Sequence, residues 1–482
     1  QHDGRVMPLD TLAREGTWQV TGRSRWVGTD PVALVLGWSL YPQGWATEPV
    51  IALGGGSLAA AIGLPPRTRH ASFQALTGNP RMLDLIGQAR ALEEQEQRLP
   101  PLLKEALKVD GRLAWMQGFL EGSTLRILPP SGDPNAPWAS PGRLGSAADL
   151  LAVLDAGSPE WPPEQAMARE VTYNRVRPSR LAWWILACAT ALSLLAWNLR
   201  RRWLDVLAVA GLVAGFAVMT WGIAARWQVA GRIPASNMYE SMLFLGWGVA
   251  LFALVAVLFL RNRLVIFNAT AMAALTMILA DCLPMDPFVH PVPPVLAGTV
   301  WLAIHVPIIM VSYSVLALGV LVAHMQIAFE VFAPRRRGLP AMMSDLLYWY
   351  IHVGAILLIA GILTGSIWAA SSWGRYWGWD PKEVWSLIAF LAYLAILHGR
   401  LERLIGPFGV ALVSILAFWT IIMTYVGVNF VLASGLHSYG FGSSAVVRWL
   451  ILIATAEALF LGAGAFAHMT RRSAERNSPS RP

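Results

Sequence analysis

Residues 301–332 read WLAIHVPIIMVSYSVLALGVLVAHMQIAFEVF, an almost uninterrupted apolar run. A helix needs about 20 predominantly apolar residues to cross the hydrocarbon core of a bilayer, so this run is long enough to span it. Eight further apolar runs lie on either side of it, at 181–198, 203–225, 238–260, 264–283, 343–370, 384–399, 408–433 and 446–468. The sequence therefore predicts an all-α polytopic membrane protein with about nine transmembrane helices. The run at 384–399 is short, and its helix is expected to start inside the preceding loop.

The composition of the chain agrees with this prediction. Of its 482 residues, 55% are hydrophobic and only 14% are charged, whereas soluble proteins carry about 25% charged residues. This balance excludes a disordered chain, a soluble enzyme and a disulfide scaffold. Cys188 and Cys282 are isolated, and without a Cys-x-x-Cys pair the chain supplies no thiol-redox centre or cysteine metal site of its own.

Residues 1–178 differ from the rest and are predicted to form a mainly helical, water-soluble domain. Helix-forming residues predominate from Ser72 to Leu120, where Pro100-Pro101 separates at least two helices. Residues 124–128 alternate polar and apolar side chains, which predicts one short strand. Residues 131–142 are rich in Pro, Gly and Asn and are predicted to form a loop.

Basic residues predict the orientation of the spans. Residues 181–482 hold 19 basic and 11 acidic residues, whereas the 18 basic and 18 acidic residues before them balance. One alternating set of polar breaks holds 14 basic residues: Arg200–Arg202, Arg261, Arg263, Arg335–Arg337, Arg400, Arg403, Arg471, Arg472, Arg476 and Arg481. The other set holds five: Arg226, Arg232, Arg375, Lys382 and Arg448.

The positive-inside rule places the rich set in the cytoplasm. Residues 1–178 and the breaks of the other set then lie outside, 181–470 form the transmembrane domain, and 471–482 form a basic cytoplasmic tail. Arg175, Arg177 and Arg180 precede the first span and oppose this orientation. A charge excess of this kind is a topology signal, and no nucleic-acid partner is expected. The chain opens at Gln1 without Met, so an upstream segment is expected.

Tryptophan is concentrated in the predicted outer loop at 368–385, which holds five of the 23 Trp residues. The core of the loop, 373–383, reads WGRYWGWDPKE. Membrane proteins often carry Trp belts at the bilayer interface, and a plain belt stays open here. A belt spreads over many helix ends, however, whereas these Trp residues are crowded beside Asp, Lys and Glu. The pattern favours an aromatic platform for a large flat apolar ligand that carries carboxylates.

Two histidines are expected on the same side of the membrane as this loop. His305 lies at the outer end of the run 301–332, and His437 lies in the outer loop after the run 408–433. Two neutral imidazoles beside a tryptophan platform are suitable axial ligands for haem iron. Each histidine taken singly would more often be a hydrogen-bonded structural residue. Their combination with the Trp loop favours the ligand interpretation.

Further ionisable residues fall within the predicted spans. His398 is expected at the inner end of its span, about 20 Å deeper than the Trp loop, and an ionisable residue at membrane depth is a functional candidate. His324 and His352 also fall near the inner face, where hydrogen-bonded interfacial roles are favoured. Glu457, in the middle of the last run, needs a partner that the sequence does not identify. The remaining histidines are interpreted as incidental: His2, His70, His290 and His468.

The motif Trp-Gly-x-x-Trp-x-Trp-Asp-Pro-Lys-Glu-x-Trp at 373–385 resembles the tryptophan-rich motif of the haem-handling proteins of cytochrome c biogenesis. Its Pro-Lys-Glu ending resembles the System II, CcsA-type cytochrome c synthase branch. Other segments agree, so that the resemblance covers about 236–440: Ser236–Ser241, Trp301–Tyr313, Leu397-His398, Gly427–Phe430 and Gly435–Gly440. Gly4–Thr11 resembles, more weakly, the start of the outer domain in fused CcsB–CcsA forms.

The resemblance implies roles for the candidate site residues. His305 and His437 match the two outer haem ligands of the family, and His398 matches one of its two intramembrane ligands. The faces of three aromatic residues would cover the ring: Trp373, Trp377 and Trp379. Arg375 and Lys382 would pair with the propionates, although a solvated loop charge is an equal alternative for Lys382. Asp380 belongs to the motif and is also suited to cap the helix that starts at Pro381.

The function implied by the resemblance is c-type cytochrome biogenesis in the bacterial plasma membrane. Haem b, handled as a substrate, would enter from the cytoplasmic side and be held at an inner site that includes His398. It would then pass to the outer site, where the thiols of an apocytochrome c Cys-x-x-Cys-His segment add to its vinyl groups. The second inner ligand is expected from a CcsB-type membrane subunit or fused segment. Components of a thiol-reducing pathway and membrane lipid are the further implied partners.

Two other functions stay open at this point. One is a haem-delivery subunit without synthase activity, and the other is a transporter of a different solute. Haem attachment in cells that lack their own pathway would separate the first from a synthase, and a haem absorbance band would count against the second. For residues 1–178, a docking surface for the apocytochrome or a partner and a passive spacer are equal expectations.

Overall fold

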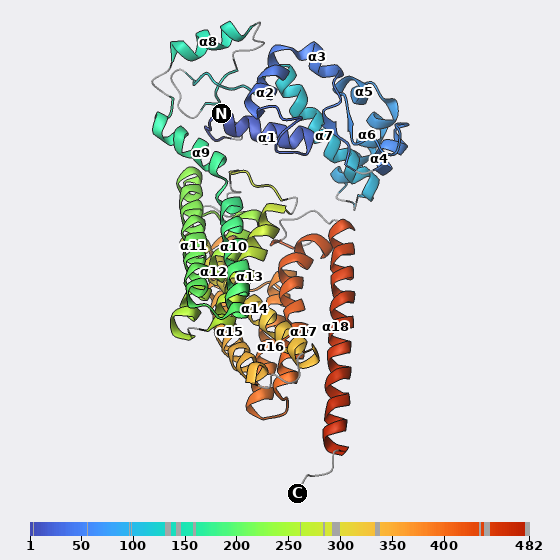
Figure 1. Cartoon of the computed structure of the whole chain (residues 1–482). Coiled ribbons are helices and arrows are strands. Elements are labelled where there is room, and N and C mark those ends of the chain that lie inside the picture. The colour runs from blue at the N-terminus through green and yellow to red at the C-terminus, as the bar shows by residue number, and fades with distance from the viewer. Residues whose placement is uncertain are drawn as a thin grey trace. The chain divides into compact units, whose positions relative to one another are not determined.

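The computed structural model describes residues 1–2, 4–54, 56–95, 97, 99–130, 136–140, 146–157, 161–260, 262–282, 285–291, 299–332, 338–432, 435–437 and 444–477. The chain divides into two compact units, Gln1–Arg175 with Phe288–Pro291 and Val176–Pro287 with Val292–Pro482 (Figure 1). Some sequence predictions lie outside the described residues: the loop at 131–135 and 141–142, the basic residues Arg261, Arg335–Arg337 and Arg481, and the motif positions 438–440.

The first unit is helical around a small antiparallel pair of strands. Asn79 caps the sixth helix and Pro101 opens the seventh, so the break expected at Pro100-Pro101 is confirmed. The elements are α1 (Leu9–Thr21), α2 (Pro31–Leu40), α3 (Pro42–Thr47), β1 (Ile51–Ala52), α4 (Gly56–Ala61), β2 (His70–Ala71), α5 (Phe73–Thr77), α6 (Pro80–Glu94), α7 (Pro101–Leu120), α8 (Ala147–Ala156) and α9 (Glu164–Val176). Arg5, in the motif at 4–11, forms an ion pair of 2.8 Å with the buried Glu170 of α9.

The strand predicted at 124–128 is wrong. The backbone N–H of Thr124 donates to Gly118, and that of Leu125 donates to Gly122, so this segment forms turns that close the end of α7. Only Leu128 pairs in the manner of a strand, in an isolated bridge with Ala139. The alternating pattern therefore reflects a turn with Leu125 buried beneath it, and not a strand.

The second unit consists of long apolar helices, as predicted. Within the described residues, nine helical segments are long and apolar enough to cross a membrane. The helices are α10 (Pro178–Leu199), α11 (Arg202–Ala230), α12 (Met238–Leu260), α13 (Arg263–Cys282), α14 (Val300–Phe332), α15 (Gly338–Trp373), α16 (Pro381–Leu401), α17 (Pro407–Ile422) and α18 (Ser444–Asn477). α16 starts three residues before the predicted run because Asp380 caps it and Pro381 occupies its first turn. The chain is an integral membrane protein with multiple spans.

The predicted run 408–433 is not a single α-helix. α17 ends at Ile422, and the chain continues as a π-helix, η2 (Met423–Leu432). The π-helix is rare and occurs mostly as single turns, frequently at functional sites. Sequence periodicity alone did not predict this change, which alters the faces on which Tyr425 and Asn429 lie.

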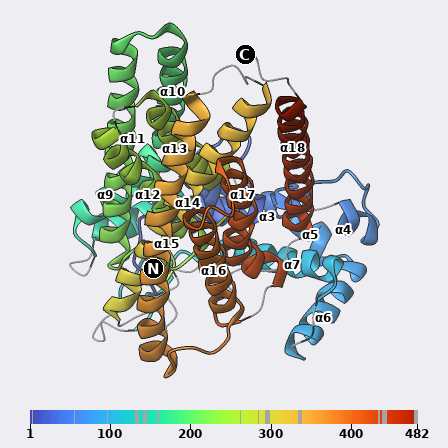
Figure 2. The ribbon, with the colours of Figure 1, turned by 90° about the horizontal axis from the view of Figure 1, so that it is seen from below.

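α14 is the central helix of the second unit. It contacts α12, α13, α15, α17 and α18, and Figure 2 shows α10–α13 and α18 on opposite sides of the group α14–α17. Glycines of α15 permit a close approach, because a Cβ at Gly354 would lie 2.5 Å from Leu316 and a Cβ at Gly365 would lie 2.5 Å from the His305 ring. The tight α14–α15 interface therefore fixes the position of His305.

The partner of Glu457 is found on neighbouring helices. Its carboxylate accepts hydrogen bonds from the indole N–H of Trp419 on α17 and from His324 Nε2 on α14, the latter at 3.0 Å. Further along α18, His468 pairs with Glu330 of α14 at 3.3 Å. His324 is thus a hydrogen-bonded residue, as favoured from the sequence, and His468 is a packing contact of α18 instead of an incidental residue.

Candidate functional site

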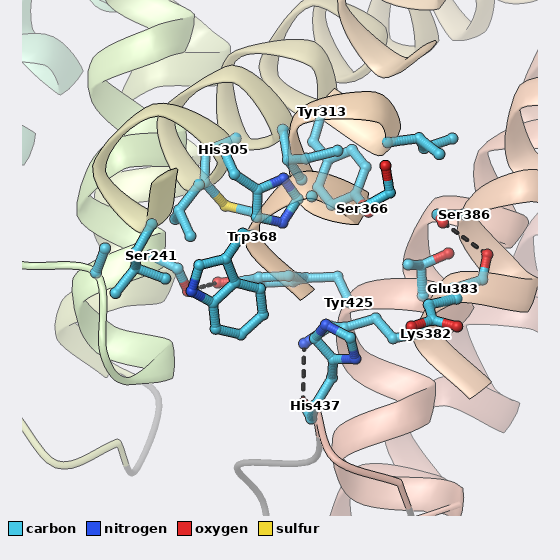
Figure 3. A pocket seen from close by; sticks show the side chains of 18 of the residues that line it. Ser241, His305, Tyr313, Ser366, Trp368, Lys382, Glu383, Ser386, Tyr425 and His437 are labelled. Carbon is cyan, nitrogen blue, oxygen red and sulfur yellow. Dashed lines mark hydrogen bonds between the residues drawn. The ribbon is translucent and has the colours of Figure 1, made fainter. Parts of the chain in front are cut away.

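A cavity that is partly open to solvent lies among α12, α14, α15, α16 and η2, and its empty space, with the solvent at its mouth included, amounts to about 1040 Å³. Four of the candidate residues line the cavity: His305, His437, Trp377 and Lys382. Figure 3 shows that the two histidines approach it from different elements, His305 from α14 and His437 from the segment after η2.

The His305 imidazole is oriented by the backbone of α15. Its Nδ1 lies 2.8 Å from the carbonyl oxygen of Gly361. Because a carbonyl only accepts hydrogen bonds, Nδ1 carries the proton and the Nε2 lone pair is available. Gly365 leaves the space that the ring occupies. His305 therefore presents the tautomer that a metal ligand requires.

His437 is held by a carboxylate in the same way. Its Nδ1 donates a hydrogen bond of 3.0 Å to Asp380 Oδ1, which leaves the Nε2 lone pair available. Asp380 Oδ2 accepts from the backbone N–H of Leu436 at 2.7 Å. Gly435 has a φ of +93°, and a Cβ there would clash with the Asp380 carboxylate. Glycine at this position therefore permits the close approach of the two segments.

The charge of Asp380 is stabilised by these contacts. Burial raises the pKa of its carboxyl, but the hydrogen bond from His437 and those from the backbone N–H groups of Lys382 and Leu436 outweigh burial and lower the pKa to about 2. Asp380 also forms a capping box with Glu383, so the predicted N-cap of α16 is confirmed. One carboxylate thus starts α16 and orients His437.

Trp368 neighbours both imidazoles, as Figure 3 shows. Its ring is parallel to that of His305, with 6.2 Å between centroids and 7° between planes, and its centroid is 5.8 Å from that of His437. Trp368 is 1% exposed, and its Nε1–H is buried without a hydrogen-bond partner within the described part of the chain. Trp368 belongs to the Trp-rich segment 368–385, but its sequence position did not indicate this role.

The three predicted platform residues occupy different places. Trp377 lines the cavity. Trp373 packs edge-on against both Trp368 and His437, with 4.6 Å between centroids in each pair. Trp379 is 71% exposed and is not among the described residues that line the cavity. The structure therefore brings Trp373 and Trp377 to the histidines and leaves Trp379 outside.

The two predicted cations also differ. Lys382 lines the cavity, and its Nζ donates to the His437 carbonyl oxygen at 3.2 Å. Arg375 forms a 3.2 Å ion pair with Glu383 and lies over the Trp373 ring at 5.7 Å. Lys382 is thus placed for contact with an anionic ligand group, whereas the described contacts hold Arg375 in the loop scaffold.

A polar wall closes the cavity on the side of α12. The Ser241 hydroxyl is hydrogen-bonded to the Tyr425 hydroxyl at 2.7 Å, which joins α12 to η2. The preceding residue, the fully buried Glu240, pairs with Arg226 at 2.9 Å and with Arg232 at 3.1 Å. Sequence reasoning missed this network. The available signal was Glu240 itself, because it is the third residue of the apolar run 238–260 and a charge within such a run requires a partner.

His398 lies apart from the cavity. Its Nδ1 is 2.8 Å from the Leu394 carbonyl oxygen of the same helix, and its ring is exposed within this chain. The position is 16 residues beyond Lys382 on α16, or about 24 Å along the helix axis. His398 therefore cannot share a ligand with His305 and His437.

Comparison with known proteins gives a consistent family match. Residues 235–437 match the family model described as cytochrome C assembly protein. The chain is 33% identical to a CcsA cytochrome c biogenesis protein of Prochlorococcus marinus, over 46% of this chain and 80% of that protein. It is 34% identical to a CcsA protein of Synechococcus sp., over 53% of this chain and 92% of that protein.

The alignment extends further in a longer relative. Protein NrfI of Wolinella succinogenes is 31% identical over 91% of this chain but only 53% of its own length, so the chain spans about half of that relative. A solved structure of the cytochrome c haem lyase CcmF aligns with a TM-score of 0.42 and 18% identity, covering 60% of this chain and 50% of that chain.

Proposed function

The chain belongs to the cytochrome c assembly protein family, and on this premise we propose that it binds haem between His305 and His437 and presents it for covalent attachment to apocytochrome c. One observation carries the proposal: both imidazoles line one cavity, and each has its Nδ1 hydrogen-bonded to an acceptor. The chain spans about half of NrfI, and the activity of the complete protein is part of the proposal.

The lining of the cavity fits haem as a substrate. Two Nε2 lone pairs suit the axial positions of the iron, and Trp368 and Trp377 supply apolar ring surface. The buried Nε1–H of Trp368 has no partner within the described residues, so an acceptor on the ligand would satisfy it. The Lys382 ammonium at the wall suits a propionate. These residues would hold the haem ring. The Gly361 carbonyl oxygen would fix the orientation of the His305 imidazole, and the Asp380 carboxylate would fix that of His437.

The contribution of the protein to attachment would be positioning and ligand control. Each thioether forms when an apocytochrome thiol adds across a vinyl group: the sulfur bonds to one vinyl carbon and the thiol hydrogen is transferred to the other. No electron is gained or lost in this addition, and no cysteine of the present chain takes part. His437 is the ligand better placed to be replaced afterwards, because it lies in a short segment after η2 and not within a helix.

Titration of the purified full chain with haem tests the proposal. Wild-type protein is expected to give the absorbance spectrum of bis-histidine haem, and His305→Ala and His437→Ala are expected to weaken or shift it because each removes an axial ligand. Added imidazole should restore part of the spectrum. His352→Ala is the control, since the His352 Nδ1 is bonded to the Tyr348 carbonyl oxygen of its own helix and the residue is not among the described residues that line the cavity.

A second measurement separates attachment from delivery. Cells without their own attachment pathway would receive the chain, its partner segment and an apocytochrome, and covalent haem would be detected on the cytochrome. Spectra that stay unchanged in both cavity variants would refute the haem site. Haem binding without covalent product would leave a haem-delivery subunit as the function.

A further inference from the structure

Two aromatic side chains of the loop after α15 face solvent. Trp379 is 71% exposed and Tyr376 is 67% exposed, whereas Trp368 in the same cluster is buried. Tyr376 also lines the cavity, so it stands at the mouth. The Trp379 ring packs edge-on against Trp377, with 5.9 Å between centroids and 89° between planes. The exposed pair is therefore continuous with the cavity lining through Trp377.

The backbone holds Trp379 in an unusual conformation. Its φ is +57°, in the left-handed region that side chains with a Cβ rarely adopt. The two residues that flank Trp379 are both held by Glu383. Its carboxylate accepts hydrogen bonds from the backbone N–H of Gly378 at 2.8 Å and from that of Asp380 at 3.2 Å. The Arg375 guanidinium holds Glu383 in turn. A strained conformation persists where its surroundings determine it, and such residues cluster at functional sites.

The strained segment leaves a large indole mostly exposed. Trp379 is 71% exposed, and the ring pair described for it is the one with Trp377. Exposed Trp and Tyr on a rigid support are the residues that most often anchor protein interfaces, because they bury much area at little cost in side-chain entropy. The geometry therefore indicates a partner that lies against the mouth of the cavity.

We propose that Trp379 and Tyr376 form a docking surface for the cysteine-bearing peptide segment of the protein that receives the haem. The proposal rests on the proposed function and names the second substrate of that site. An acceptor thiol must reach a ring held between His305 and His437, so its peptide must cross the mouth that Tyr376 borders. In this assignment Trp379 contacts the peptide and not the haem.

The substitution Trp379→Asn separates contact with the peptide from contact with the haem. Asn tolerates the left-handed region, so Trp379→Asn removes the ring and keeps the loop. The probe is a fluorescently labelled synthetic peptide with a Cys-x-x-Cys-His sequence, titrated into the purified haem-loaded full chain. Trp379→Asn should weaken peptide binding by about tenfold, with the haem spectrum unchanged, because Trp379 is not among the described residues that line the cavity. Tyr376→Ala should weaken peptide binding by a similar factor. Trp379→Phe should keep most of the affinity.

Each other outcome overturns the proposal in a recognisable way. Unchanged peptide affinity in both variants would leave the haem site intact and remove the docking surface. Loss of haem in Trp379→Asn would assign the ring to the haem site. A change confined to partitioning into phospholipid vesicles would make Trp379 an interfacial belt residue. A wild-type chain that binds no haem would refute the proposed function and this inference together.

Discussion

Trp368 combines two properties that a single substitution can separate. Its ring stacks against His305, and its buried Nε1–H has no partner within the described residues. An unsatisfied buried donor lowers stability by about 1–3 kcal/mol. A ligand acceptor would relieve that penalty, so the N–H group would oppose the stability of the ligand-free protein and favour the bound state.

We therefore expect Trp368→Phe to weaken haem binding about five- to tenfold, as the loss of one hydrogen bond of about 1 kcal/mol implies. The matched control is Trp38→Phe in the first unit, where another fully buried indole N–H has no partner within the described residues. Both variants lose the same atoms, and only Trp368→Phe should change haem affinity. Haem titration measures this difference, and equal affinities would show that the N–H does not face the substrate.

Gly365 sets the distance between α15 and the His305 ring. An added Cβ would lie 2.5 Å from Cε1 of the imidazole, so Gly365→Ala must displace the ring or the helix. Haem affinity is expected to fall by on the order of tenfold, or about 1.4 kcal/mol. Gly462→Ala on α18 is the control, because an added Cβ there meets nothing within 4 Å. Equal haem affinity of the two variants in titrations would contradict the assigned position of His305.

Single residues also show how far sequence reasoning reaches. That His305 and His437 line one cavity could be predicted, because both histidines were expected on the same side of the membrane as the dense Trp loop. Trp368 could not be assigned, because a Trp at the end of a span has the same sequence signature whether it faces lipid or a cavity. The outward direction of Trp379 depends on hydrogen bonds from Gly378 and Asp380 to Glu383, which sequence spacing does not encode.

At the scale of elements, most helix ends were predicted to within five residues, whereas α18 extends nine residues beyond the predicted run and η2 was not predicted. Apolar periodicity gives the length of a span and its capping residues give its start. A π-helix has nearly the same apolar composition as an α-helix, and its stability depends on contacts with other elements. Here the Tyr425 hydroxyl is hydrogen-bonded to that of Ser241 on α12, which lies 184 positions earlier in the chain. Tyr425 also lines the cavity.

The last helix, α18, is attached to the rest of its unit by polar contacts. Glu457 joins it to α14 and α17, and His468 joins it to α14. Hydrogen bonds between transmembrane helices contribute on average about 0.6 kcal/mol and at most about 1.7 kcal/mol. A double-mutant cycle of Glu457→Gln and His324→Ala should therefore give a coupling energy of about 1 kcal/mol in thermal unfolding of the purified protein.

The control for this cycle is Thr455→Ala, because Thr455 bonds only to Ile451 within α18 itself. The effects of Thr455→Ala and His324→Ala on the free energy of unfolding should be additive. A coupling energy near zero for Glu457 and His324 would show that the ion pair does not form in the membrane protein. The haem spectrum should stay unchanged in all of these variants, since neither residue lines the cavity.

At the scale of the whole molecule, we predict that His398 contributes to a second haem site whose other ligand lies outside this chain. Haem iron prefers two axial ligands, and His398 supplies one ring whose Nδ1 is bonded to its own helix. His324 is excluded as the second ligand, because Val320 and Glu457 occupy both of its ring nitrogens. Sequence alone left His324 open, since its partner on α18 is 133 positions away.

The second axial ligand of the iron at the predicted His398 site is therefore expected from outside this chain, from a CcsB-type membrane segment. Such a segment fits the alignment with NrfI, nearly half of which has no counterpart here. The chain expressed alone in cells should load its cavity poorly, because haem would not be relayed from the site of His398. Co-expression of that segment should raise the bound haem several-fold, and His398→Ala should abolish the increase while leaving titration of the purified cavity with added haem unchanged. Full loading of the chain alone, removed by His352→Ala, would instead place the second ligand on α15.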